Sequence, residues 1–174
     1  LFTGVGGVVI NRDAETKGAE LSLQMSPADG WDIMLGGAWT DAEVKDVPLS
    51  LTAQNRTLDV KPTYSPEFQA SGLVRYEWEA LGGSMSVQGD FSYSDEFYYN
   101  LRNFDADKFD SYVLYNARLG WMNADESWDL ALSFKNLTDE RAGLQGYDLA
   151  NLCGCNEVSY RPPRMVAASA RYSF

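Results

Sequence analysis

The chain has 174 residues and is acidic, with 25 Asp and Glu residues against 14 Lys and Arg residues and a formal net charge of −11. This balance argues against nucleic-acid binding, which requires a basic surface stripe. Histidine is absent, which removes the usual general base and most zinc sites, although carboxylates alone can support catalysis. We expect no enzymatic activity, no catalytic residue, no metal and no cofactor.

Seven long segments alternate between apolar and polar residues with a period of two, which predicts β-strands with one apolar face. In chain order they cover approximately residues 8–25, 31–44, 67–78, 84–99, 110–122, 127–136 and 163–174. Their lengths suit the roughly 9–11 residues that a tilted strand needs to cross a bilayer. Strands of soluble sheets are commonly shorter, at about 5–6 residues.

The connections between these segments alternate between short and long. Tight turns rich in Gly, Asn, Asp and Pro occur at 26–30, 79–83 and 123–126. Longer connections occur at about 45–66, 101–109 and 137–162. In an up-and-down antiparallel sheet, every short turn then falls at one end and every long loop at the other. Bacterial outer-membrane barrels have this asymmetry, with short periplasmic turns and long external loops.

Aromatic residues gather at the short-turn end of the predicted sheet. Four tryptophans lie on apolar faces beside short turns, namely Trp31, Trp78, Trp121 and Trp128. Tyr172 and Phe174 fall at the same level, at the end of the sequence. Because Trp and Tyr favour the boundary between membrane and water, we expect these residues to form a periplasmic aromatic girdle.

A soluble β-sandwich, whose apolar face would be a protein core, is the alternative fold. It explains neither the length of the segments nor the gathering of tryptophans at one end. The sequence therefore favours an all-β fold, in which about seven up-and-down strands form a segment of an antiparallel transmembrane β-barrel.

Three stretches carry a resemblance to a known family. The stretches "NRDAETKGAELSLQMSPADGWDIMLGGAWTDAEVKD" and "FDSYVLYNARLGWMNADESWDLALSFKNLTDE" resemble late barrel strands of TonB-dependent outer-membrane receptors. Within the second stretch, "KNLTDE" at 135–140 is typical of the penultimate strand and the loop after it. The ending "YRPPRMVAASARYSF" resembles the last strand, with its leading Pro pair and terminal Phe.

The resemblance implies a segment of a barrel of about 22 strands, whose lumen is closed by a separate N-terminal plug. It implies location in the bacterial outer membrane and uptake of a scarce nutrient, such as a ferric siderophore, cobalamin or a glycan, with energy passed on by TonB. The terminal Phe174, with Tyr172, also resembles the signal that the barrel-assembly machinery reads in this family.

We expect residues 1–174 to be the C-terminal portion of a receptor barrel, with the plug domain and signal peptide absent. The chain opens on Leu1 rather than Met, and an odd number of antiparallel strands leaves open edges that lipid cannot satisfy. The expected partners are outer-membrane lipid, the remaining barrel strands and plug, TonB through the missing N-terminal part, the barrel-assembly machinery and a small-molecule substrate.

Two clusters in the long connections combine aromatic residues with arginine, as ligand and partner surfaces do. The candidate ligand-binding residues are Tyr98, Tyr99, Arg102, Asn103, Tyr147, Asp148, Arg161 and Arg164. An equally good interpretation is that they are interface tyrosines and solvated loop charges.

Cys153 and Cys155 lie in the last long connection, which the barrel hypothesis places outside the cell. A local disulfide is favoured there, because the compartment is oxidising and the cysteine count is even. The alternatives are pairing with a cysteine elsewhere in a longer chain, or metal capture at a site that would lack ligands.

Glu20, Glu77 and Asp90 are predicted to face the lumen. They could form an acid/base pair, but cross-strand pairing with arginines or simple hydration is the favoured interpretation. Two other classes of function stay open: a small autonomous outer-membrane barrel acting as an adhesin or enzyme, and a soluble binding sandwich.

Overall fold

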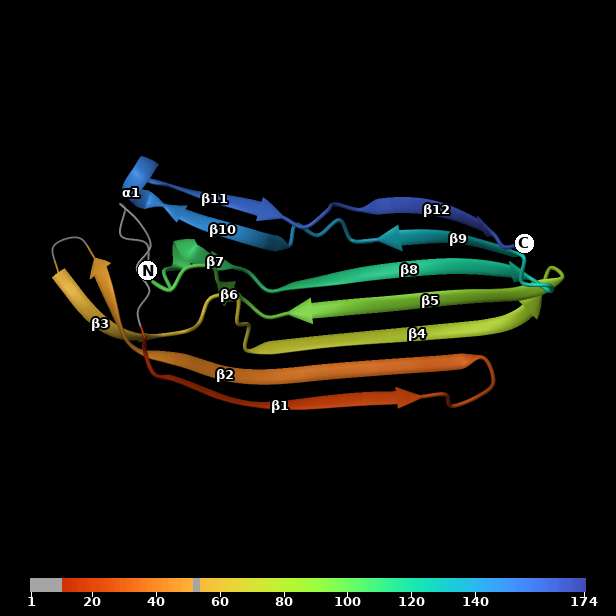
Figure 1. The fold of residues 1–174 in the computed structure, drawn as a ribbon, viewed down its shortest axis with the longest axis horizontal. Coiled ribbons are helices and arrows are strands. Elements are labelled where there is room, and N and C mark those ends of the chain that lie inside the picture. Colours follow the sequence, from red (N-terminus) through yellow and green to blue (C-terminus); the bar gives the residue numbers. More distant parts are fainter. Residues whose placement is uncertain (1–10, 52–53) are drawn as a thin grey trace.

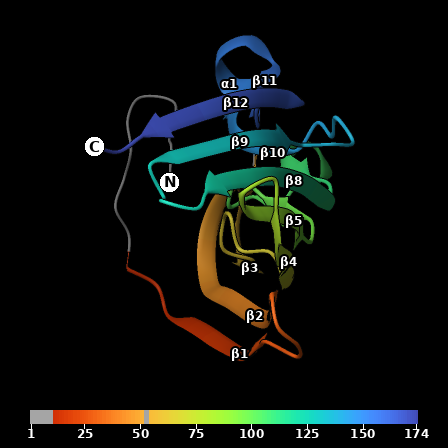
Figure 2. The same ribbon diagram turned by 90° about the vertical axis from the view of Figure 1, so that its right-hand side faces the viewer.

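The computed structural model describes residues 11–51 and 54–174. Seven long antiparallel strands lie side by side in one curved sheet, in the order β1-β2-β4-β5-β8-β9-β12 (Figure 1 and Figure 2). They are β1 (Ala14–Met25), β2 (Trp31–Leu51), β4 (Phe68–Ala80), β5 (Gly83–Ser94), β8 (Tyr112–Asn123), β9 (Trp128–Lys135) and β12 (Met165–Tyr172). The predicted all-β, up-and-down antiparallel arrangement is therefore confirmed.

The sheet has one continuous apolar face, because the register aligns the apolar residues of neighbouring strands. Leu35 of β2 lies opposite Leu23 of β1, and Val87 of β5 lies opposite Leu119 of β8. Val87 and Leu119 are 45% and 42% exposed. In the part of the chain that the structure describes, no second sheet covers this face. Within the described residues, the sheet is therefore not one layer of a sandwich.

The opposite face is polar, and its side chains bond to one another. Glu77 accepts a hydrogen bond from Arg75 at 2.5 Å and another from Ser84 at 2.8 Å. Asp90 accepts a hydrogen bond from Asn116 of the neighbouring strand at 2.6 Å. These partners support the pairing interpretation of Glu77 and Asp90 over an acid/base pair. The arginine that meets Glu77 lies on the same strand, however, rather than across the ladder.

The short connections are tight turns, all at the end where the C-terminus lies (Figure 1). The β4–β5 turn consists of Leu81 and Gly82, which have φ angles of 54° and 70°. Two successive positive φ angles define a type I′ turn, whose twist matches that of the flanking strands. The β8–β9 turn closes on Asn123, whose Oδ1 accepts a hydrogen bond from the Trp128 N–H at 2.7 Å.

The long connections contain secondary structure that the sequence did not predict. β3 (Gln54–Val60) pairs with the outer part of β2, and β6 (Phe97–Tyr98) pairs with β7 (Lys108–Phe109) after the short 3-10 helix η1 (Asp105–Asp107). The last connection holds β10 (Gly143–Leu149), α1 (Ala150–Cys153) and β11 (Cys155–Tyr160). Among the described residues, no helix is both long and apolar enough to span a membrane.

Three predicted strand boundaries were wrong. The segment expected at 84–99 ends at Ser94, because its partners on both sides end there and Phe97 and Tyr98 turn to pair with β7. The segment expected to end at 44 continues to Leu51, because β3 supplies a partner for it. The first segment was expected from residue 8, but β1 begins at Ala14 and residues 11–13 are not in a strand; residues 1–10 lie outside the described part.

The β4–β5 turn offers a test of the hairpin geometry. We predict that Leu81→Asn stabilises the folded protein by about 1 kcal/mol, because a bulky side chain is strained at positive φ and Asn is not. Gly82→Ala should destabilise it by a similar amount. Thermal unfolding of the purified barrel in detergent measures both. Shifts of the same sign in the two variants would contradict the type I′ assignment.

Candidate functional site: the outer loop cluster

The three long connections pack together at the end of the sheet away from the C-terminus (Figure 1). We call the described residues of 44–66, 95–111 and 137–164 the outer loop cluster. The middle connection lies between the other two and contacts both. Tyr64 from the first connection also reaches the third, where its hydroxyl accepts a hydrogen bond from the Gly146 N–H at 3.2 Å.

Two small apolar centres hold the outer loop cluster together. Phe97, Tyr99 and Phe109 form the first, and the Phe109 ring centroid lies 5.6 Å and 5.0 Å from those of Phe97 and Tyr99. Gly146 permits the close approach of β10, because a Cβ there would lie 2.6 Å from the Tyr99 ring. The second centre comprises Val47, Leu49 and Val60, with Leu101 of the middle connection packed against them.

Asn156 of β11 joins the last connection to the middle one. Its Nδ2 donates to the Tyr99 hydroxyl at 2.9 Å, the Ala106 carbonyl at 2.8 Å and Asp107 Oδ1 at 3.3 Å. The Tyr99 hydroxyl itself donates to the Ala106 carbonyl at 2.6 Å. Burial, followed by the charge of Asp107, raises the pKa of Tyr99, so this hydroxyl keeps its proton at neutral pH and can donate it.

Asn103 joins the middle connection to the first. It adopts a φ of 52°, a left-handed conformation that Asn tolerates better than most residues. Its Nδ2 donates to the Lys61 carbonyl at 3.1 Å, and its Oδ1 accepts from the Lys61 N–H at 2.7 Å. The side-chain amide of Asn103 thus both donates to and accepts from the backbone of Lys61, as the backbone of a neighbouring strand residue would.

A buried group of charges lies between the middle and last connections. Arg102 forms an ion pair with Asp148, and its guanidinium lies 3.8 Å from Asp107. Asn100 Nδ2 donates to Asp148 Oδ2 at 3.2 Å. Burial raises the pKa of Asp107, while the Arg102 charge and the Asn156 hydrogen bond oppose that rise. Buried charges of this kind are stable only when their partners stay in place.

The structure divides the predicted ligand-binding residues into two groups. Tyr99, Arg102, Asn103 and Asp148 come together inside the outer loop cluster, where their polar atoms bond to other loop residues. Tyr98 is half-buried beside them. The remaining three, Tyr147, Arg161 and Arg164, are exposed.

Of the exposed residues, Arg161 has the clearest geometry. Its guanidinium stacks over the Tyr112 ring at 5.5 Å. Both side chains line a hollow of about 730 Å³ that also touches Glu20, Gln69 and Ser94 on the polar face of the sheet. Arg161 is therefore the predicted residue best placed to meet a molecule passing along the polar face.

Three residues that hold the outer loop cluster together were not predicted from the sequence, namely Tyr64, Asp107 and Asn156. Asp107 lies in the acidic stretch "DADKFD", where any carboxylate could be a solvated surface charge. Asn156 and Tyr64 carry no local signal at all, because their partners lie 57 and 82 residues away in the sequence.

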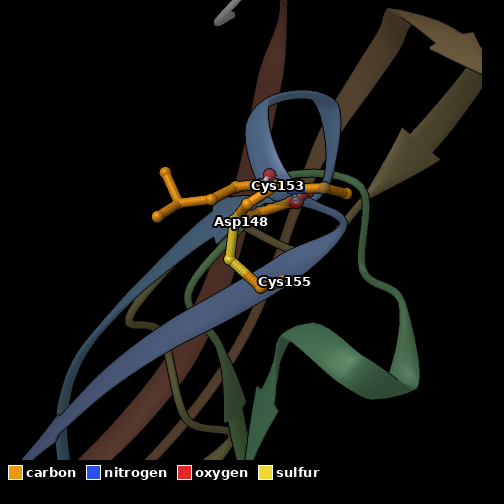
Figure 3. Close-up of a disulfide and its surroundings, with 5 residues drawn as sticks. Asp148, Cys153 and Cys155 are labelled. Carbon is orange, nitrogen blue, oxygen red and sulfur yellow. Dashed lines mark hydrogen bonds between the residues drawn. A yellow bond between two sulfur atoms is a disulfide. The ribbon is translucent and has the colours of Figure 1, made fainter.

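Cys153 and Cys155 form a disulfide at the tip of the last connection, with their Cα atoms 5.2 Å apart (Figure 3). Gly154 between them has a φ of 67° and ends α1 in a left-handed cap. Asp148 lies just before α1, and its Oδ1 accepts a hydrogen bond from the Ala150 N–H at 2.8 Å. The disulfide therefore closes the tip that carries Asp148.

Aromatic rings meet at the opposite, short-turn end. Trp31 packs on Tyr76 at a centroid distance of 4.7 Å, and Trp78 stacks on the same Tyr76 at 5.5 Å. Trp128 packs on Tyr172 at 5.0 Å. Trp121 also lies at this end, near the close of β8. The roles of these rings as a girdle, and of Tyr172 with Phe174 as an assembly signal, stay predictions.

Residues 2–137 match the family described as TonB dependent receptor-like, beta-barrel. The chain belongs to this family. A comparison with curated protein sequences gave no match.

Solved structures of receptors share the fold. The siderophore receptor PiuA of Acinetobacter baumannii is 21% identical with a TM-score of 0.73, covering 91% of this chain and 22% of that one. The ferric yersiniabactin uptake receptor FyuA of Yersinia pestis is 18% identical with a TM-score of 0.77, covering 92% and 24%. BauA, the ferric preacinetobactin receptor of A. baumannii, is 19% identical with a TM-score of 0.70, covering 95% and 23%. The chain thus spans less than a quarter of each of these proteins.

We predict that Asn156→Ala frees the middle connection from the last one. The change removes a donor from three acceptors, two of them on the buried residues Tyr99 and Asp107, so the local opening free energy should fall by about 1–3 kcal/mol. Hydrogen exchange at the amides of 97–107 measures it. Glu157→Ala is the control, because this exposed neighbour on the same strand makes no side-chain bond in the described part of the chain. Equal exchange in both variants would contradict the joining role of Asn156.

Proposed function

We propose that this chain is the C-terminal part of the barrel of a bacterial outer-membrane receptor that takes up a scarce nutrient with energy from TonB. Residues 1–174 form part of the wall and of the external loops, and the plug and remaining strands come from other parts of the receptor. The observation that carries the proposal is one sheet with two unlike faces, an uncovered apolar face towards lipid and a bonded polar face towards the lumen.

The polar face fits a wall that holds a plug. Its carboxylates and amides already bond to neighbours, as Glu77 and Asp90 do, yet they stay accessible enough to accept further hydrogen bonds from a domain inside the barrel. The outer loop cluster supplies the external surface that a substrate meets first. No bond-making chemistry is required of any residue, in keeping with a transport receptor.

A ferric siderophore is the substrate class that we propose first, ahead of cobalamin or a glycan. The support comes from the proteins that share the fold: PiuA is a siderophore receptor, FyuA is an uptake receptor for ferric yersiniabactin, and BauA is a receptor for ferric preacinetobactin. The autonomous-barrel alternative is less well supported. β1 and β12 each have one neighbour among the described residues, and lipid does not tolerate such open edges.

The assignment of the lipid face can be tested with two adjacent residues. Val74 lies on the apolar face opposite Ile33, and Leu73 lies on the polar face opposite Asp90. We predict that Val74→Arg lowers barrel stability by about 2–4 kcal/mol near mid-membrane and reduces the amount of folded receptor in the outer membrane. Leu73→Arg, at the same depth, should be tolerated. Equal accumulation of both variants would contradict the assignment.

Uptake is tested in the source bacterium after the DNA upstream of Leu1 has been sequenced. We expect a plug and further alternating strands there. Deleting the whole gene should abolish TonB-dependent uptake of a radiolabelled ferric siderophore, while labelled cobalamin and a labelled oligosaccharide report on the other substrate classes. A start codon just before Leu1, or a product that stays in solution without detergent, would overturn the proposal.

A further inference from the structure

The outer loop cluster contains a charge imbalance that no other described residue corrects. Arg102, Asp107 and Asp148 form one group, and their side chains are 19%, 2% and 4% exposed. One positive charge therefore faces two negative charges in surroundings that exclude most water. An uncompensated buried carboxylate is costly, and the usual remedy is that it binds a proton.

The two carboxylates are not equally well satisfied. Asp148 receives Arg102, the Asn100 side chain at 3.2 Å and the Ala150 N–H at 2.8 Å. Asp107 accepts one hydrogen bond, from the Asn156 side chain at 3.3 Å on Oδ1, and its Oδ2 faces the Arg102 guanidinium at 3.8 Å, beyond hydrogen-bond distance. Its buried Oδ2 has no hydrogen-bond partner among the described residues. Asp148 is thus the better satisfied of the two carboxylates, and Asp107 Oδ2 is the buried oxygen left without a hydrogen bond, where a proton can be held.

The groups packed around Asp107 do not supply the missing positive charge. Tyr99 is neutral and bonds to Asn156 and to the Ala106 carbonyl. Lys108, the next residue, turns towards Glu96 and pairs with it at 3.0 Å. Asp105, two residues before Asp107 on η1, is exposed and adds only negative charge. In the described part of the chain, Arg102 is therefore the one cation that faces Asp107.

We propose that Asp107 takes up a proton when the loops are packed, and that this proton locks residues 97–109 against the β10–β11 hairpin. Asp107 is then a positioning residue, which sets the shape of the receptor mouth without touching the substrate. The lock is a property of the loops themselves. Only its use in substrate capture rests on the transport function proposed above.

The direction of the pH dependence follows from burial. The pKa of Asp107 is raised in the packed cluster, so the packed state binds a proton more tightly than the opened state does. The stability that this proton adds to the packed loops is fully present at pH values below the ordinary pKa range of Asp. It is lost as pH rises through the raised pKa. The loops should therefore be held most firmly at pH values below the ordinary Asp range and loosen as the pH rises through the raised pKa of Asp107.

Hydrogen exchange of the intact receptor in detergent tests the lock. Protection of the amides in 97–107 and 146–156, corrected for the intrinsic pH dependence of exchange, should fall with rising pH. The expected loss is about tenfold for each unit by which the pKa is raised. Asp107→Asn should keep the acid level of protection at every pH. Asp110→Asn, an exposed carboxylate in the same connection, should behave like the unchanged protein.

A second variant checks the charge count. Asp148→Asn removes one of the two carboxylates near Arg102, so that the Arg102 charge is balanced by Asp107. This lowers the tendency of Asp107 to bind a proton and should reduce the pH dependence of amide protection. Protection of the β4 and β5 amides shows that each variant is folded. Protection that does not change with pH in the unchanged protein, or a pH dependence that survives in Asp107→Asn, would overturn the proposal. Since exchange needs no substrate, a failure of transport alone would leave this result standing.

Discussion

The rest of the structure depends on the pairing of backbone hydrogen bonds between neighbouring strands. A strand in lipid has no water to satisfy its N–H and C=O groups, so each strand needs a partner along its whole length. In this sheet the register runs unbroken from β1 to β12. That pairing fixes which side chains share a face, and hence where lipid, lumen and loops lie.

The faces of the long strands could be predicted because the side to which a residue points depends only on its neighbours in the sequence. Val74 and Leu73 are both apolar, and only their place in the alternation assigns them to opposite faces. The alternation failed where the backbone departs from a regular strand. Asp46 has a φ of 52°, and the β2–β3 register shifts between Val44 and Val47, so the outer part of β2 did not look like a continuation.

The outer loop cluster could not be predicted, because its contacts join residues distant in the sequence. Tyr99 and Arg102 were recognised as an aromatic and a cation in one loop, a pattern that fits a ligand surface as well as a loop core. Which of the two applies depends on Asn156 and Asp148, which approach from another connection. The likeness to solved receptors concerns the fold, and at these identities it carries no information on such side chains.

The length of β2 has a consequence for the conditions under which the loops work. Its 21 residues span roughly 70 Å at about 3.3 Å per residue, well over the roughly 30 Å of hydrocarbon in a bilayer. In the outer-membrane receptor proposed above, the outer part of this strand would therefore carry the loops beyond the hydrocarbon. Attractions between a charged solute and the exposed loop residues are screened there by dissolved ions within about 8–10 Å. If these loops capture a charged substrate, as proposed, that capture should respond to the salinity of the medium, whereas the buried contacts beneath them should not.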